Sequence, residues 1–200
     1  MEKPADTKFP IHELLRRRWS PRAFSPQPVS PEVLGSLLEA ARWAPSSYNE
    51  QPWTYLVATQ ENPQEFQRLL STLVEGNRAW AQHAPVLMLS VAKKNFERNG
   101  QPNRHAFYDT GQATMSLIVQ ATELGLSAHQ MAGFSVEKAR ELFSIPPEWE
   151  PAAAMALGYP VEADAVPETL RAKESLPRSR KPLEDFVFSG TWKNTSSFVR

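Results

Sequence analysis

Two apolar runs in the sequence have no polar face. VLMLSVA occupies residues 86–92, and AAAMALGY occupies residues 152–159. A strand buried on both faces shows such a continuous run, whereas a half-exposed strand alternates between apolar and polar residues. We therefore expect both segments to be inner strands of a sheet. Two shorter runs, TYLVAT at 54–59 and LSAHQM at 126–131, predict further strands.

Helix signals lie between these strands. Ser30 is a favoured N-cap residue and Pro31 suits the first helical position, so a helix is expected from there to Ala44. Gly125 favours the end of a long helix over 104–124, whose small, apolar middle is expected to be buried on all sides, in a core or against a second subunit. Further helices are predicted in an opening segment that ends near Trp19, in a segment after Asn62 and Pro63 that carries Phe66, Leu69, Leu70 and Leu73, and in SVEKARELF at 135–143.

Composition limits the class of protein. The 200 residues include no cysteine, which excludes disulfides, thiolate metal sites and a cysteine nucleophile. Because 22 basic residues balance 22 acidic ones, no global field attracts nucleic acid or an anionic membrane. No apolar run matches a signal peptide or a bilayer span, so a soluble cytoplasmic protein is expected.

The chain changes character at Pro160. Beyond it prolines and charges are frequent and apolar residues are sparse, so this part cannot form a core of its own. We expect one domain, with a core over 1–160 and a C-terminal arm over 161–200. The arm either stays loose or wraps another surface.

Four arginines gather in RRRWSPRAF at 16–24. Pro21 favours extended backbone at Ser20, and residues i, i+2 and i+4 of an extended segment share a face. Arg18 and Arg22 would then project on either side of the Ser20 hydroxyl. Two guanidinium groups beside a hydroxyl make a competent phosphate site.

A second segment, LPRSRKP at 176–182, repeats the arrangement, with Arg178 and Arg180 on either side of Ser179. Each segment alone is better interpreted as an exposed basic turn. Two such segments in one chain make an anion site about as plausible as two turns.

The loop APSSYNEQPW at 44–53 is dense in small hydrogen-bonding groups. Such a loop can contact a polar heteroaromatic ring, but an ordinary turn before a strand has the same composition. No acid–base pair is evident elsewhere. The four histidines, His12, His83, His105 and His129, are dispersed without metal-ligand spacing, so we expect them to be structural and predict no metal site.

Six motifs together resemble the FMN-dependent nitroreductase family. They are RRWSPRAF, APSSYNEQPW, GNRAWA, MAGF, ALGYP and RSRKPLEDF, and they cover the chain from about Phe9 to Phe188. The resemblance implies an α+β fold with a central, mostly antiparallel sheet wrapped by helices, in an intimate homodimer. It also implies that the C-terminal arm is exchanged between subunits, with DFVF at 185–188 adding a strand to the partner.

The resemblance implies two identical FMN sites at the subunit interface. The residues expected to bind FMN are Arg18, Trp19, Ser20, Arg22, Pro45, Ser46, Ser47, Asn49, Asn77, Met131, Ala132, Gly133, Arg178 and Arg180. Arg178 and Arg180 match phosphate ligands of the family, and residues 45–49 match the loop that meets the flavin of the other subunit. Asn77 is similar to an asparagine that hydrogen-bonds the ring edge.

Two further positions refine this comparison. Ala132 and Gly133 match the pair whose backbone N–H groups face flavin N5 and O4. Many relatives carry a lysine one turn beyond the asparagine, near the N1–C2=O edge, where this chain has Trp80 or Ala81. Arg22 would then supply the positive charge that stabilises the reduced ring.

The implied function is an oxidoreductase that takes hydride from NADH or NADPH and reduces small acceptors, such as nitroaromatics or quinones, by a ping-pong mechanism. Tyr108 and Asp109, at the start of the long helix, are candidates for the substrate mouth. Two alternatives remain open: a flavin-binding or dehalogenase-like relative with little such turnover, or a helical interaction protein whose arginines hold an acidic partner. The sequence specifies neither the acceptor nor the preferred donor.

Overall fold

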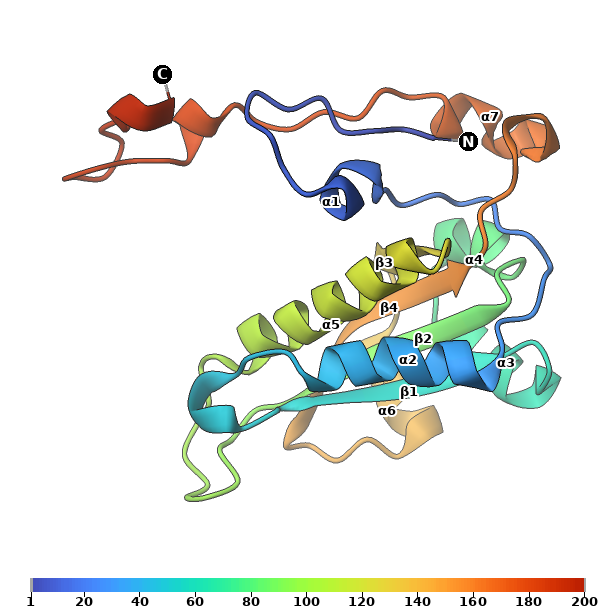
Figure 1. Ribbon diagram of the computed structural model, residues 1–200. Helices are drawn as coiled ribbons and strands as arrows, with labels where there is room; N and C mark the ends of the chain where they lie inside the picture. Colours follow the sequence, from blue (N-terminus) through green and yellow to red (C-terminus); the bar gives the residue numbers. More distant parts are fainter. Residues whose placement is uncertain (1, 200) are drawn as a thin grey trace.

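The computed structural model describes residues 2–199 and contains a four-stranded sheet with helices on both faces (Figure 1). The strand order is β1-β2-β4-β3, and each neighbouring pair is antiparallel. The strands are β1 (Trp53–Thr59), β2 (Val86–Lys93), β3 (Ser127–Met131) and β4 (Trp149–Gly158). The two segments predicted as inner strands are β2 and β4, which confirms the expectation drawn from their apolar faces.

Alternation along β2 divides the core into two layers. Leu87 and Leu89 point to one face, while Val86 and Met88 point to the other, and all four are fully buried. One face is covered by α2 (Pro31–Arg42) and α5 (Ala106–Glu123), and the other by α3 (Pro63–Leu70), α4 (Glu75–Ala81) and α6 (Val136–Phe143). The α+β fold expected from the resemblance is therefore present.

Side-chain caps fix the beginnings of these helices. The Ser30 hydroxyl accepts a hydrogen bond from the N–H of Val33, and the Ser135 hydroxyl accepts one from Lys138. Gly125 follows the end of α5 with a φ of 78°, a conformation that favours glycine. The predicted helix boundaries at these places are confirmed to within two residues.

Two local predictions differ from the structure, and a third stays open. The opening helix α1 (Glu13–Arg17) ends earlier than expected, because Arg18 already has extended ψ. Leu73 lies beyond the end of α3, although it is buried. In the protomer α5 buries one face, and Met115 and Val119 on its other side are half-buried, so burial of the whole helix against a second subunit stays a prediction.

The two chain ends run side by side away from the sheet (Figure 1). The arm contains α7 (Glu168–Glu174), and the ammonium of Lys3 donates to the carbonyls of Glu174 and Leu176. Farther along, Lys8 pairs with Glu184 at 2.8 Å. Among the described residues, the DFVF segment pairs with another extended segment only through one bridge from Phe188, and exchange of the arm between subunits stays a prediction. No helix among the described residues is long and apolar enough to cross a membrane.

Candidate functional site

The first arginine segment adopts part of the geometry expected from its sequence. Nη1 of Arg18 donates to the hydroxyl of Ser20 at 3.2 Å, so these two side chains share a face. Arg22 behaves differently, because its backbone N–H and its guanidinium group face the carboxylate of Glu174 on α7. In this segment the guanidinium group of Arg18 therefore lies beside the Ser20 hydroxyl, whereas that of Arg22 is held against the arm.

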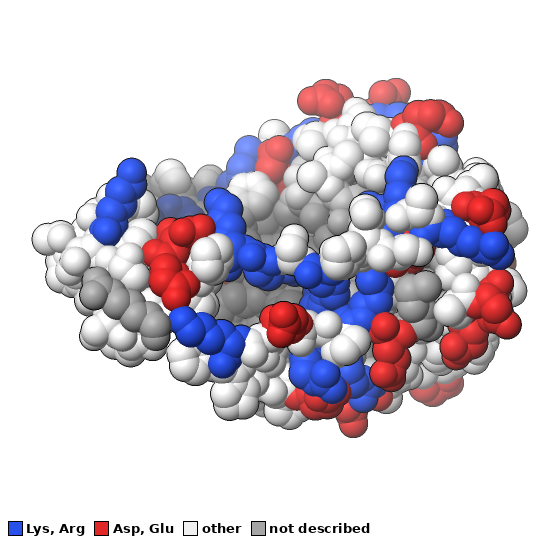
Figure 2. Space-filling model, turned by 90° about the horizontal axis from the view of Figure 1, so that it is seen from above, with Lys and Arg blue, Asp and Glu red and all other residues white. Residues whose placement is uncertain are grey.

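The second arginine segment meets the first. Burial, and then the nearby charges of Arg178 and Arg180, lower the pKa of Arg18, and the pKa of Arg178 is lowered by burial and by Arg180. We call Arg18, Arg178 and Arg180 the arginine cluster. Within the described part of the chain, none of its members forms an ion pair with a carboxylate. Figure 2 views the molecule from the side on which the two chain ends lie, and it shows Lys and Arg side chains gathered along the middle of that side.

Arg178 also has a structural task. Its Nη1 donates to the carbonyls of Lys3 and Arg16, the latter at 2.9 Å, so it ties both chain ends together. Arg180 is exposed, and its guanidinium group donates to the carbonyl of the neighbouring Ser179 at 2.7 Å. The expected pair of equivalent phosphate ligands thus consists of one anchored arginine and one accessible arginine.

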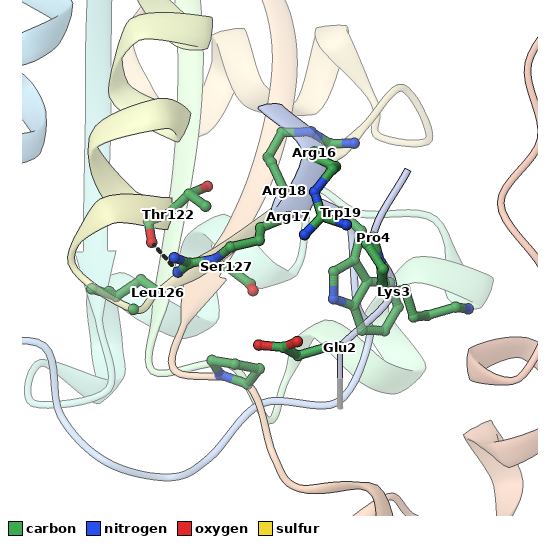
Figure 3. Close-up of a pocket in the computed structure, with 12 residues that line it drawn as sticks. Glu2, Lys3, Pro4, Arg16, Arg17, Arg18, Trp19, Thr122, Leu126 and Ser127 are labelled. Carbon is green, nitrogen blue, oxygen red and sulfur yellow. Dashed lines mark hydrogen bonds between the residues drawn. The ribbon is translucent and has the colours of Figure 1, made fainter. Parts of the chain in front are cut away.

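A cavity of about 130 Å³ adjoins Arg18 (Figure 3). Arg17 crosses its edge and donates to the carbonyl of Thr122, at the end of α5. Trp19 forms another part of the wall and lies under the ammonium of Lys3, which is 4.8 Å from the ring centroid. The remaining lining residues are Glu2, Pro4, Arg16, Gly125, Leu126, Ser127 and Pro160.

Asn77 and Gly133 come from different elements and touch. Nδ2 of Asn77, on α4, donates to the carbonyl of Gly133 at 3.0 Å, and the N–H of Val74 donates to the same oxygen at 3.0 Å. A Cβ atom on Gly133 would lie 2.6 Å from Asn77 Nδ2 and 2.8 Å from Val74 Cγ2. Close approach, rather than unusual backbone geometry, therefore requires glycine here. We call this contact the Asn77–Gly133 junction.

Two backbone N–H groups at the Asn77–Gly133 junction are available as hydrogen-bond donors. Met131 is buried at the end of β3, and the chain then turns through Ala132 and Gly133 into α6. Among the described residues, the N–H groups of Ala132 and Gly133 have no hydrogen-bond acceptor. Two adjacent free donors can bind carbonyl or imine groups of a ligand.

The loop that contains Pro45, Ser46, Ser47 and Asn49 is tightly folded. Its left-handed backbone at Tyr48 and Asn49 has φ values of 55° and 56°. The N–H of Ser47 donates to Oδ2 of Asp109 at 3.0 Å. In Figure 1 this loop lies at the opposite end of the sheet from α4, so the protomer does not bring it to the Asn77–Gly133 junction.

Asp109 holds a loop in the protomer, and its expected place at a substrate mouth stays a prediction. It lies on the core face of α5, is 3% exposed and holds the loop through Ser47. Tyr108, its neighbour on the outer face, is 69% exposed. Sequence reasoning missed the positioning role of Asp109, because nothing in the sequence links it to a loop 62 residues earlier.

Trp80 and His129 form part of the core behind the arginine segment. Their ring centroids lie 4.7 Å apart, and Nδ1 of His129 contacts the carbonyl of Pro21 at 2.9 Å. Burial lowers the pKa of His129, and the nearby charges of Arg22 and Arg18 lower it further. Trp80 and Ala81, where the resemblance implies a lysine in many relatives, are both buried. Across the described residues no cluster could hold a metal ion.

A comparison with models of protein families shows which family this chain belongs to. Residues 15–159 match the model of the nitroreductase family. The chain belongs to the nitroreductase family.

Individual relatives agree with this membership. An NADH dehydrogenase of Thermus thermophilus is 28% identical over 200 residues, covering 86% of this chain and 92% of the relative. A crystal structure described as an oxidoreductase containing FMN is 33% identical, with a TM-score of 0.87 over 95% of this chain and 96% of the other. A nitroreductase family protein from Clostridium difficile 630 is 27% identical, with a TM-score of 0.69 over 90% and 97%.

Proposed function

We propose that this nitroreductase-family protein is an FMN-dependent oxidoreductase that takes hydride from NADH or NADPH and reduces small acceptors such as nitroaromatics or quinones. The arginine cluster is the observation that carries this proposal. Burial lowers the pKa values of Arg18 and Arg178, and the charges of the neighbouring guanidinium groups from the two chain ends lower them further. Converging cations without a carboxylate partner fit a phosphate group, which makes charge-assisted bonds with each of them.

The residues present fit FMN at both of its ends. Arg18, Ser20 and Arg180 would hold the phosphate, with Arg178 fixing the segment that carries the last of them. Asn77, already oriented by its bond to Gly133, would bind the edge of the ring.

The chain's part in the chemistry is placement and electrostatics. When bound, FMN would supply the hydride-accepting centre, and ping-pong kinetics would follow if one site serves both donor and acceptor. The free N–H groups of Ala132 and Gly133 would orient the ring by donating to its edge. Arg22 would place a positive charge where negative charge accumulates on reduction, and such preorganised charge stabilises the reduced state. No titrating side chain is needed for these roles.

We further propose that the protein works as a homodimer. The loop at residues 45–49 lies far from the Asn77–Gly133 junction of its own protomer, so it would serve the flavin of the partner. The arm also leaves large apolar side chains exposed in the protomer. They are Phe186, Trp192 and Phe198. A second subunit would cover these apolar side chains, because isolated soluble proteins rarely leave such patches open.

Anaerobic reduction tests this function. The purified protein should take up FMN, turn yellow, lose its colour with NADH or NADPH, and regain it with a nitroaromatic or a quinone. Riboflavin, which lacks the phosphate, should bind more weakly if the arginine cluster has the proposed role. A yellow protein that neither donor bleaches would indicate a flavin-binding relative with little turnover, and a protein that takes up no FMN would refute the proposal.

A further inference from the structure

Helix α7 of the arm buries a carboxylate. Glu174, at the end of this helix, is 2% exposed. Its Oε1 accepts a hydrogen bond from the backbone N–H of Arg22 at 3.1 Å and lies 4.0 Å from Arg22 Nη1. The backbone carbonyl of Glu174 accepts a hydrogen bond from the ammonium group of Lys3. One glutamate therefore joins the arm to the first arginine segment, 152 residues earlier.

This arrangement does not maximise stability. Burial raises the pKa of Glu174, while the N–H and charge of Arg22 and the charge of Lys3 oppose that rise. The raised pKa means that the folded protein holds the charged form at a cost near neutral pH, and that this cost disappears as pH falls through the pKa. A neutral residue of the same shape would avoid the cost.

We propose that Glu174 is a positioning residue of the flavin site, which fixes the backbone and guanidinium group of Arg22 and so couples docking of α7 to FMN binding. The inference rests on the proposed function, which assigns Arg22 to the cofactor. Arg22 is two residues from Ser20, and its charge reaches His129 on β3. By holding Arg22, Glu174 on α7 therefore places a cation between the arm and β3, the strand that leads to Gly133.

Glu168 provides a matched control on the same helix. It is exposed and pairs with Arg171 at 2.6 Å, one turn away. Exposed pairs of this kind contribute little to stability. Glu168→Gln and Glu174→Gln change the net charge equally, but only the second alters a group that contacts Arg22.

The test compares FMN dissociation constants and apo-protein melting temperatures of these two variants. Glu174→Gln keeps an acceptor for the Arg22 N–H but releases the guanidinium group, so its dissociation constant should rise about three- to tenfold. Its melting temperature should equal or exceed that of the wild type, because a buried charge is gone. Glu168→Gln should stay within about twofold of the wild-type dissociation constant.

Two further variants separate positioning from simple stabilisation. Glu174→Ala also leaves the Arg22 N–H without its acceptor, so it should bind FMN more weakly than Glu174→Gln. In an Arg22→Leu background, Glu174→Gln should cause no further loss, because the guanidinium group through which it acts is absent.

Several results would overturn the inference. A Glu174→Gln variant that binds FMN as tightly as Glu168→Gln, or that melts lower while binding normally, would make Glu174 a structural residue only. These outcomes refute the coupling while the wild type still binds FMN. A wild-type protein without FMN affinity would instead refute the proposed function, and the coupling with it.

Discussion

The Asn77–Gly133 junction and the arginine cluster hold their residues by different means. The junction is made by the core: α4 and the loop after β3 are joined by two hydrogen bonds to one carbonyl and by contact too close for a Cβ atom. The arginine cluster is made by the chain ends, where α1 and the arm meet outside the sheet. Packing fixes the Asn77–Gly133 junction, whereas the arginine cluster forms only when the two chain-end segments lie against each other.

This difference predicts that the two regions respond differently to ligand binding and to substitution. Packing resists displacement, so the junction should keep its shape whether or not a ligand is bound. Like charges repel, so the arginine cluster costs energy until an anion enters it. Ligand binding should therefore stabilise the chain ends more than the core, and substitutions in the two regions should fail in different ways.

The largest effect is expected from Gly133→Val, which breaks the core-made region. The new side chain would displace Asn77 and Val74, because even its Cβ atom would lie within 2.8 Å of both. FMN affinity should fall by at least about a hundredfold, with a loss of about 1–3 kcal/mol of stability from overpacking. Equilibrium dialysis and thermal unfolding of the apo protein measure the two quantities.

Gly35→Val is the control for this substitution. Gly35 lies in α2, and a Cβ atom there would meet no other atom within 4 Å. Its variant should retain both FMN affinity and melting temperature. If Gly133→Val melted much lower but bound FMN normally, Gly133 would be a packing residue outside the site.

Arg18→Ala breaks the region made by the chain ends and should have a smaller effect. It removes a charged donor to the phosphate, at about 1.5–3 kcal/mol, which is about a tenfold to hundredfold loss of FMN affinity. The melting temperature of the apo protein should not fall, because repulsion with Arg178 and Arg180 is relieved. Arg42→Ala, an exposed arginine paired with Glu39 on α2, controls for net charge. Unchanged FMN affinity in Arg18→Ala would remove the cluster from the site.

Features that depend on local sequence could be predicted. The two-sided burial of β2 and β4 follows from their unbroken apolar runs, and the start of α2 follows from Ser30 and Pro31. Helix α4 escaped prediction, because it has only seven residues and its N-cap, Val74, makes no side-chain hydrogen bond. A short helix without a cap leaves little local pattern, and its tertiary packing decides that it forms.

The candidate site divides in the same way. The shared face of Arg18 and Ser20 follows from the proline after them. By contrast, the contacts of Asp109 with Ser47 and of Glu174 with Arg22 join residues 62 and 152 positions apart. In the sequence nothing marks Glu174 as buried, and Asp109 is only a candidate for the substrate mouth. Only the tertiary fold shows that both are buried and hold segments proposed to contact the flavin.

The smallest predicted effect concerns His129, which links the two regions. It lies on a core strand, but its ring contacts the carbonyl of Pro21 in the first arginine segment. Burial lowers its folded-state pKa, so the neutral ring contributes stability that is present above the unfolded pKa, about 6.5, and is lost as pH falls through the folded pKa. The apo protein should therefore lose stability on acidification below that value.

Urea unfolding midpoints at pH 7.5 and at pH values below 6 would measure this dependence. His129→Gln keeps a donor for Pro21 but cannot be protonated, so its midpoint should vary less with pH than that of the wild type. His83→Gln, in the turn after α4, removes a histidine without this contact and should leave the wild-type slope intact. Saturating phosphate should reduce the acid sensitivity of the wild type, because an anion beside Arg18 offsets the repulsion that protonated His129 meets there. An identical pH slope in His129→Gln and the wild type would show that the core and the chain ends do not communicate through this ring.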